Sequence, residues 1–244
     1  MILVSNSDVE SDSPHSKPRG GEESLRRPGD PPAGATVLHP LVLASTSPRR
    51  RDLLAENGYQ FTIVDPGIDD ALLREPKGVR PDQWACSLAY LKASAAVRRC
   101  RHLHVPLSDE TVVLGADTVV IKAGMLIGKP ADAADAGRII RLLRAGEHRV
   151  VTGVALLCPR TDRRQIFADT ATVRFGELGD GAVDEYVASG NWRGKAGGYN
   201  LFERSAAGWP LSWEGDPTAI VGLPVAALRK ALSTWPSGHG ATGG

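Results

Sequence analysis

The sequence predicts an α/β protein with a mixed β-sheet flanked by helices. Segments of β type alternate with segments of helical hydrophobic spacing, and at least two pairs of strands are joined by short turns. Short turns join antiparallel strands, whereas crossover helices join parallel ones, so the sheet should contain both kinds of pair. The 244 residues, 42% of them hydrophobic, are enough to bury one substantial core.

The first ordered segment should be a strand that runs through a hydroxyl-rich bend into a helix. Residues 41–44 are apolar, Ser47 suits an N-cap whose side chain accepts a backbone N–H, and Pro48 suits the first helical position. The helix N-terminus carries roughly half a positive charge. It would act with the side chains of Ser45, Thr46, Ser47 and Arg49 to Arg51. Together these groups favour an anion such as a phosphate chain.

The next two elements carry a carboxylate pair and a lysine. Residues 60–64 alternate as a strand parallel to the first, and Asp69 and Asp70 follow its end. Such carboxylates can hold a metal, cap a helix or stay solvated in a loop. A helix should span residues 80–101, with Lys92 beside its apolar seam. Lys92 either belongs to a functional site or is a surface residue whose ammonium group reaches the solvent.

A central strand over residues 111–121 contains an acid, Asp117. An ionised carboxylate in a buried strand is costly unless it is paired or bound to a cation. Asp117 is therefore a functional candidate, with a structural salt bridge as the alternative. A hairpin turning at residues 123–124 would bring Lys129 to the mouth of the sheet, either toward a ligand or into an exposed loop.

The remaining elements follow from periodicity and turn signals. We expect helices at residues 132–145, 181–188 and 225–232, antiparallel strands at 148–157 and 165–175, and a hairpin of 201–203 with 211–213. His148 is either a structural hydrogen-bonding residue or a catalyst. Lys195 lies in a glycine-rich segment, which can admit a ligand close to the backbone or simply connect two elements.

Composition indicates which parts of the chain are ordered and which classes of partner are excluded. Residues 1–40 and 236–244 are rich in small, polar and charged residues and are expected to be disordered around one domain at 41–235. A net charge of +1 argues against polymeric nucleic acid, and no apolar run reaches the roughly 18 residues of a membrane helix. Three widely spaced cysteines favour a reducing, cytoplasmic location.

The candidate residues combine cations with carboxylates. Cations and a helix N-terminus suit a polyphosphate, and carboxylates suit the hard divalent metal that accompanies one. The sequence contains no Walker-type loop, no G-x-G-x-x-G after a strand and no G-x-S-x-G. P-loop enzymes, dinucleotide dehydrogenases and serine hydrolases are therefore disfavoured.

Six short motifs, in this order, resemble those of the Maf family of nucleoside triphosphate pyrophosphatases. They are Ser45-Thr46-Ser47-Pro48-Arg49-Arg50, Gly115-Ala116-Asp117-Thr118, Gly128-Lys129-Pro130, His148-Arg149-Val150-Val151-Thr152, Lys195-Ala196-Gly197-Gly198-Tyr199 and Val221-Gly222-Leu223-Pro224. The resemblance covers about residues 42–232. It implies an elongated twisted sheet in two lobes with a central cleft, the Maf and inosine triphosphatase type of fold, and a homodimer.

The resemblance also implies a reaction and the residues that carry it. A nucleoside triphosphate would be hydrolysed to the monophosphate and pyrophosphate with Mg²⁺, Mn²⁺ or Co²⁺, by water attack on the α-phosphorus. Asp117 would be the general base and, with Asp70, a metal ligand. Asp70 stands where the family usually has a glutamate. Lys92 and Lys129 would be catalytic, because they hold the phosphates and stabilise the leaving pyrophosphate. Ser45, Arg49, Arg50, Thr118 and Lys195 would bind the substrate.

The chain departs from the dTTP/UTP-specific branch after Tyr199. That branch continues Gly-Ile-Gln, and here Asn200-Leu201-Phe202 follows, so that Phe202 takes the place of an amide able to read a base edge. We expect dTTP, UTP or a modified pyrimidine nucleotide as substrate. The alternatives are a modified or purine triphosphate, or a nucleotide-binding cell-division regulator with little catalysis.

Overall fold

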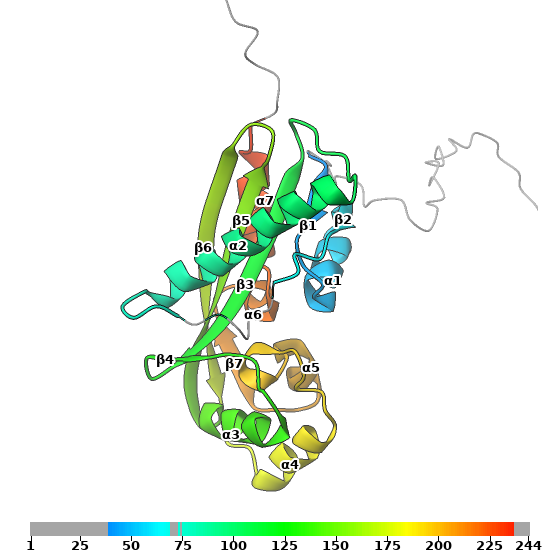
Figure 1. Ribbon diagram of the computed structural model, residues 1–244. Coiled ribbons are helices and arrows are strands. Elements are labelled where there is room, and N and C mark those ends of the chain that lie inside the picture. The colour runs from blue at the N-terminus through cyan, green and yellow to red at the C-terminus, as the bar shows by residue number, and fades with distance from the viewer. Residues whose placement is uncertain (1–38, 69–72, 74, 237–244) are drawn as a thin grey trace, which may run out of the picture. The chain divides into compact units, whose positions relative to one another are not determined.

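The computed structural model describes residues 39–68, 73 and 75–236. Within them, seven strands form one mixed sheet with the order β2-β1-β3-β5-β6-β7, and β4 pairs with β3 (Figure 1). The pairs of β1 with β2 and β3 are parallel and the others are antiparallel, which confirms the mixed sheet. The strands are β1 (Leu41–Leu43), β2 (Phe61–Ile63), β3 (Val112–Lys122), β4 (Met125–Ile127), β5 (Gly146–Cys158), β6 (Arg163–Phe175) and β7 (Leu211–Glu214).

The helices confirm most of the periodicity-based predictions. They are α1 (Pro48–Glu56), α2 (Pro81–His102), α3 (Ala133–Leu143), α4 (Asp180–Ala188), the 3-10 turn η2 (Ala196–Gly198), α5 (Leu201–Ala206), α6 (Pro217–Val221) and α7 (Val225–Ser233).

The hairpin predicted for residues 201–203 and 211–213 is wrong. Residues 201–206 form helix α5, because Asn200 caps it by accepting a hydrogen bond from the backbone N–H of Glu203 at 3.0 Å. Strand β7 pairs with β6 instead. An Asn followed three residues later by Glu is a helix-start signal, which here outweighs the strand preference of Leu and Phe.

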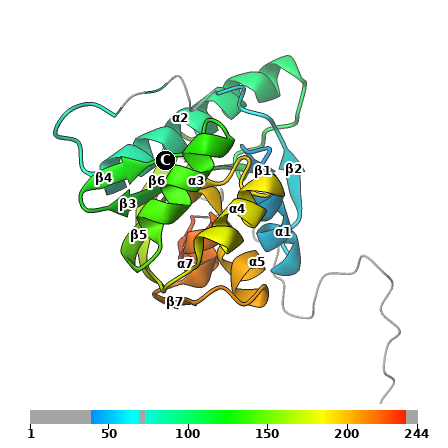
Figure 2. The same cartoon turned by 90° about the horizontal axis from the view of Figure 1, so that it is seen from below.

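Helices cover both faces of the sheet (Figures 1 and 2). On one face, helix α2 packs against β1, β3 and β5 through small side chains such as Ala89 and Ala93. A β-carbon built at Gly115 would lie 2.2 Å from the carbonyl oxygen of Ala89, and one at Gly153 would lie 2.3 Å from the carbonyl carbon of Ala85. Only glycine at these positions lets α2 approach the strands so closely.

The other face of the sheet carries two separate hydrophobic clusters. One cluster packs α1 and α7 against β1 and the adjoining ends of β3 and β5. The second cluster packs α3, α4 and the start of α5 against the opposite ends of β3, β5 and β6. These clusters form the two lobes that the resemblance implies.

Several predictions fall on residues outside the described part of the chain. Residues 1–38 and 237–244 lie there, so the disorder expected for residues 1–40 and 236–244 stays a prediction. Asp69 and Asp70 also lie outside the described residues.

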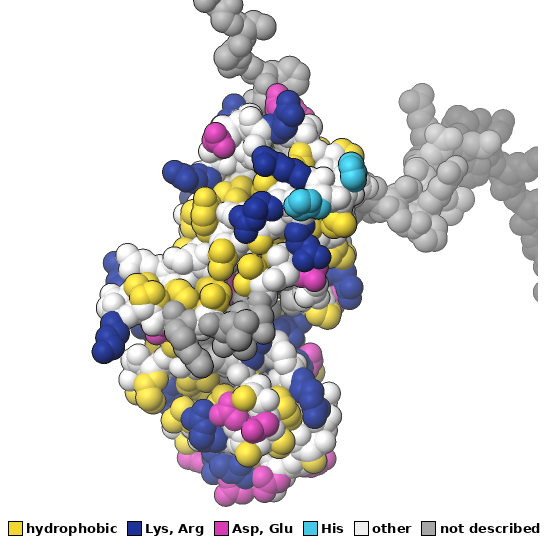
Figure 3. Space-filling model, in the orientation of Figure 1, with side chains coloured by type: hydrophobic (Ala, Val, Ile, Leu, Met, Phe, Trp, Pro, Cys, Tyr) yellow, Lys and Arg dark blue, Asp and Glu magenta, His cyan; other side chains and the backbone are white. Residues whose placement is uncertain are grey.

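The surface carries charges of both signs, and no described helix is long and apolar enough to cross a membrane. On the face seen in Figure 3, acidic side chains gather at the lower end of the molecule. There Asp180 and Asp184 accept hydrogen bonds from Arg141 at 2.9 and 2.5 Å.

Candidate active site

The candidate site lies along an open stretch of strand β3. Strand β1 pairs with β3 only at Val112–Leu114, and β4 pairs with it only at Val120–Lys122. Among the described residues, the intervening part of β3 is paired on one side alone, by β5. A cavity of about 420 Å³ lies here, lined by residues from both lobes.

The bend after β1 forms one wall of this cavity. Ala44 still donates its N–H to Leu114 of β3 at 2.8 Å, and the chain then turns into helix α1. The expected side-chain cap of Ser47 is wrong: Ser47 is the N-cap but makes no capping hydrogen bond through its hydroxyl. Its own backbone N–H donates to Oγ of Ser45 at 3.2 Å instead. The hydroxyl of Ser45 therefore organises the bend.

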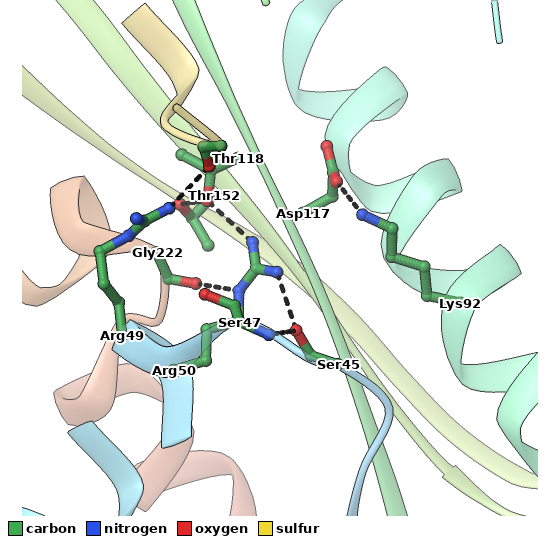
Figure 4. A network of polar contacts seen from close by, with 10 residues as sticks. Ser45, Ser47, Arg49, Arg50, Lys92, Asp117, Thr118, Thr152 and Gly222 are labelled. Atoms are coloured by element: carbon green, nitrogen blue, oxygen red, sulfur yellow. Dashed lines mark hydrogen bonds and ion pairs between the residues drawn. The ribbon is translucent and has the colours of Figure 1, made fainter. Parts of the chain in front are cut away.

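The guanidinium of Arg50 ties this wall to the neighbouring elements (Figure 4). It donates to the carbonyl oxygen of Gly222 at 2.8 Å, to Oγ of Ser45 at 3.3 Å and to Oγ1 of Thr118 at 3.2 Å. The Arg50 side chain is buried, so these bonds are shielded from water. Arg50 thus positions the bend as well as lining the cavity.

Thr118 is held in a hydroxyl pair with Thr152 of β5. Their Oγ1 atoms lie 2.8 Å apart, and Thr152 donates to the carbonyl oxygen of Ala219 at 2.7 Å. Thr152 was not expected as a site residue. Its place in the His148–Thr152 motif, four residues after His148 and hence on the same strand face, was the available signal.

Asp117 and Lys92 form a buried ion pair on the opposite side of β3 (Figure 4). The ammonium nitrogen of Lys92 lies 2.5 Å from Oδ1 of Asp117, and each side chain is 8% exposed. The close approach of α2 to β3 places Lys92 there. The salt-bridge alternative raised for Asp117 is thereby met, and the pair lies in the cavity wall; the functional role of Asp117 stays a prediction.

Arg49, Lys129 and Lys195 also line the cavity. The guanidinium of Arg49 donates to the carbonyl oxygen of Gly194 at 3.1 Å, which links the two lobes across the cavity. Burial lowers the pKa of Arg49, and the charge of Glu203 opposes that shift. Glu203 also accepts a hydrogen bond from the ammonium of Lys195. Glu203 was not expected in the site because its segment was predicted to be a strand.

His148 and Tyr199 lie at the end of the cavity lined by the second lobe. Nε2 of His148 lies 2.8 Å from the Tyr199 hydroxyl, and the His148 side chain is buried. Burial and the nearby charge of Lys122 lower the pKa of His148 to about 4, so it is neutral at physiological pH. The hydrogen bond to Tyr199 agrees with the prediction that His148 is a structural hydrogen-bonding residue.

The structure brings most of the predicted site residues into this one cavity. They are Ser45, Arg49, Arg50, Lys92, Asp117, Thr118, Lys129 and Lys195. Phe202 is not brought there: it lies on α5, is 42% exposed, and is not part of the cavity lining. Its aromatic ring is a poor candidate for reading a base in this arrangement.

The donor set of the cavity fits a divalent metal that arrives with a triphosphate. Among the described residues, no group of three or more His, Cys, Asp and Glu side chains could hold a metal ion by itself. The carboxylates of Asp117 and Asp65 do line the cavity. Mg²⁺ is usually held by one or two carboxylates together with substrate phosphates rather than by a cage of protein ligands.

Comparison with known proteins agrees with the geometry of the site. Residues 40–235 match the family model described as Maf-like protein. The chain is 38% identical to a dTTP/UTP pyrophosphatase of Pelotomaculum thermopropionicum, with 79% of this chain and 94% of that protein covered. Proteins of the same name from Shewanella frigidimarina and Cereibacter sphaeroides are 38% and 40% identical; each match covers 79% of this chain, and 95% and 93% of those proteins.

Proposed function

The chain belongs to the Maf family, and from this premise we propose that it hydrolyses dTTP and UTP to the nucleoside monophosphate and pyrophosphate. The relatives that share 38–40% identity with it are named for this activity. The observation that carries the proposal is the buried Lys92–Asp117 pair in a cavity that is also lined by the cations Arg49, Arg50, Lys129 and Lys195. A carboxylate in a phosphate-binding cavity repels the substrate, so its presence points to catalysis rather than to binding alone.

The cationic groups of the cavity would hold the triphosphate. The N-terminus of α1, the hydroxyl of Ser45 and the charges of Arg49, Lys129 and Lys195 surround the same space. Arg50 would keep the bend and Thr118 in place for this contact. Preorganised donors of this kind stabilise charge that develops on a leaving pyrophosphate.

Asp117 would act as the general base. Its carboxylate accepts a proton from the water whose oxygen forms a bond to the α-phosphorus, while the bond from the α-phosphorus to the bridging oxygen breaks and pyrophosphate leaves. Lys92 orients Asp117 through the 2.5 Å contact. A divalent cation (Mg²⁺, Mn²⁺ or Co²⁺), held by Asp117 and Asp70 with the phosphates, would supply neutralisation of the phosphate charge.

The test is a substrate screen with position-specific labelling. Purified full-length protein is assayed for pyrophosphate release from canonical and modified triphosphates with Mg²⁺, Mn²⁺ or Co²⁺, and dTTP and UTP are expected to react fastest. In ¹⁸O-labelled water, the label should enter the nucleoside monophosphate, because the α-phosphorus is attacked. Label found only in the pyrophosphate would overturn the proposed attack on the α-phosphorus. A purine triphosphate that reacts faster than dTTP and UTP would overturn the proposed substrate preference.

The rival function is a nucleotide-binding regulator of cell division with little catalysis. Such a protein needs the cationic cavity but not Asp117. Tight binding of dTTP without pyrophosphate release under every metal condition would favour it. A cytoplasmic location, in keeping with the free thiols of Cys86, Cys100 and Cys158, and assembly as a homodimer are parts of the same proposal. Analytical ultracentrifugation measures the assembly.

A further inference from the structure

The apolar end of the cavity has the character of a nucleobase pocket. Val120, Val150, Leu201 and Ile220 line it and belong to the cluster of the second lobe or pack against it. Base-binding pockets pair apolar walls with a few well-placed polar groups. Here the polar groups are His148 and Tyr199, which also line the cavity.

His148 presents a buried polar atom that has no partner. Its side chain is 3% exposed, and its Nδ1 makes no hydrogen bond to any described residue. Leaving a buried polar atom unpaired is costly, and His148 lines the cavity, so a ligand that reaches Nδ1 would complete the bond. Its other ring nitrogen is already engaged with Tyr199.

The Tyr199 hydroxyl contacts one of the two ring nitrogens of His148. In the described part of the chain, the Tyr199 hydroxyl has one hydrogen-bond partner, Nε2 of His148 at 2.8 Å. The tyrosine ring is fixed by Phe175 and Trp209, with ring centroids 5.6 and 6.0 Å away. Either group can be the donor in this contact. If the Tyr199 hydroxyl donates, Nε2 is the acceptor and the single proton of the neutral imidazole lies on Nδ1, which is then a donor without an acceptor.

We propose that Nδ1–H of His148 donates a hydrogen bond to the carbonyl oxygen at position 4 of uracil or thymine, and that Tyr199 maintains the required tautomer. This makes His148 a specificity-determining residue and Tyr199 its positioning residue. The inference rests on the proposed function and deepens it by naming the groups that select the base.

The position of His148 along β5 favours oxygen 4 over oxygen 2 of the base. His148 lies four residues, or about 13 Å of strand, beyond Thr152, which belongs to the Arg50–Thr118 end of the cavity. Oxygen 2 is next to the glycosidic nitrogen, whereas oxygen 4 lies on the side of the ring away from the sugar and phosphates. Cytosine has an amino group at position 4, and two facing donors repel one another.

Two amide substitutions distinguish the contributions of the two ring nitrogens of His148 to base selection. His148→Gln places an amide near the Nε2 position and can still meet Tyr199, but it has no donor at Nδ1. His148→Asn places an amide N–H near Nδ1 and loses the contact with Tyr199. His102→Gln, at the exposed end of α2, is the matched control. The measured quantity is the ratio of kcat/KM for dTTP to kcat/KM for dCTP.

The proposal expects His148→Gln to lower this ratio by about 10-fold to 100-fold, mainly through a higher KM for dTTP. His148→Asn should retain more of the ratio than His148→Gln, and Tyr199→Phe should lower it because the tautomer is no longer maintained. Folding is checked by thermal melting. An unchanged ratio in folded His148→Gln overturns the proposal.

The tautomer is tested in the wild-type protein without any variant that must fold or react. Imidazole ¹⁵N spectra of histidine-labelled protein should show His148 protonated at Nδ1, and dTMP should perturb that nitrogen far more than dCMP does. Protonation at Nε2, or equal perturbation by the two nucleotides, overturns the inference. If the wild-type protein released no pyrophosphate while dTMP still perturbed His148 selectively, the proposed function alone would fail.

Discussion

The ammonium nitrogen of Lys92 lies 2.5 Å from Oδ1 of Asp117, although the two residues come from different elements and are both buried. An isolated charge at either position would be strongly unfavourable, and each residue makes the burial of the other tolerable. The pair is therefore a structural feature, and the catalytic role proposed for Asp117 can be measured separately from its contribution to stability.

Asp117→Asn should lower kcat by about 100-fold to 1000-fold while KM for dTTP changes little. The amide keeps the size of the carboxylate and an oxygen acceptor for Lys92, but it cannot accept the proton of the attacking water. Steady-state pyrophosphate release measures the effect. Asp162→Asn, in the exposed turn between β5 and β6, is the control and should keep wild-type activity. Comparable turnover in the two variants would remove Asp117 from the role of base.

Lys92→Met should lower the free energy of unfolding by about 3–5 kcal/mol, because it leaves the carboxylate of Asp117 buried without its partner. Urea denaturation measures this loss. The double variant Lys92→Met, Asp117→Asn should recover part of the lost stability, since neither residue then carries a charge. Lys230→Met, on the exposed side of α7, should change stability little. If the double variant is no more stable than Lys92→Met, the pair does not explain the loss.

Hydrophobic periodicity predicted the long helices and strands because each of these elements buries one face or one stripe. Asp117 could be identified for the same physical reason, since a carboxylate inside an apolar strand demands a partner. Spacing along the chain could not identify that partner. Lys92 meets Asp117 only because Gly115 and Gly153 let α2 lie against the strands.

Local hydrogen bonding explains where the predictions were wrong. Asn200 starts a helix that turns the expected hairpin strand into α5 and brings Glu203 to Lys195. At the bend before α1, the hydroxyl of Ser45 accepts the backbone N–H of Ser47, while the hydroxyl of Ser47 caps no N–H of the first turn. Both outcomes depend on which of several competing acceptors lies closest in the folded chain, and that information is tertiary.

The stability of the protein should fall by about 3 kcal/mol as the pH is lowered from about 6.5 to about 4, through His148 alone. The pKa of this residue in the folded protein is lowered to about 4 by burial and by Lys122, from an ordinary value of 6.5. In that pH window the unfolded chain binds a proton that the folded chain does not, so the contribution of His148 is complete above pH 6.5 and is lost on acidification.

Urea titrations at a series of pH values measure this dependence. His148→Gln should remove about 3 kcal/mol of it, while the exposed His102→Gln should leave it unchanged. A pH dependence that is the same in wild type and His148→Gln would mean that His148 is protonated in the folded protein near its ordinary pKa.

Phe202→Gln should leave the preference among dTTP, UTP and dCTP unchanged, although it restores the glutamine of the dTTP/UTP branch. Phe202 is 42% exposed on α5 and does not line the cavity, so an amide there meets solvent rather than a base. The matched comparison is His148→Gln, which introduces the same amide at a buried position in the cavity wall. The ratio of kcat/KM for dTTP to that for dCTP should respond to the second substitution and not to the first. A clear gain in this ratio for Phe202→Gln would require α5 to turn residue 202 toward the bound nucleotide.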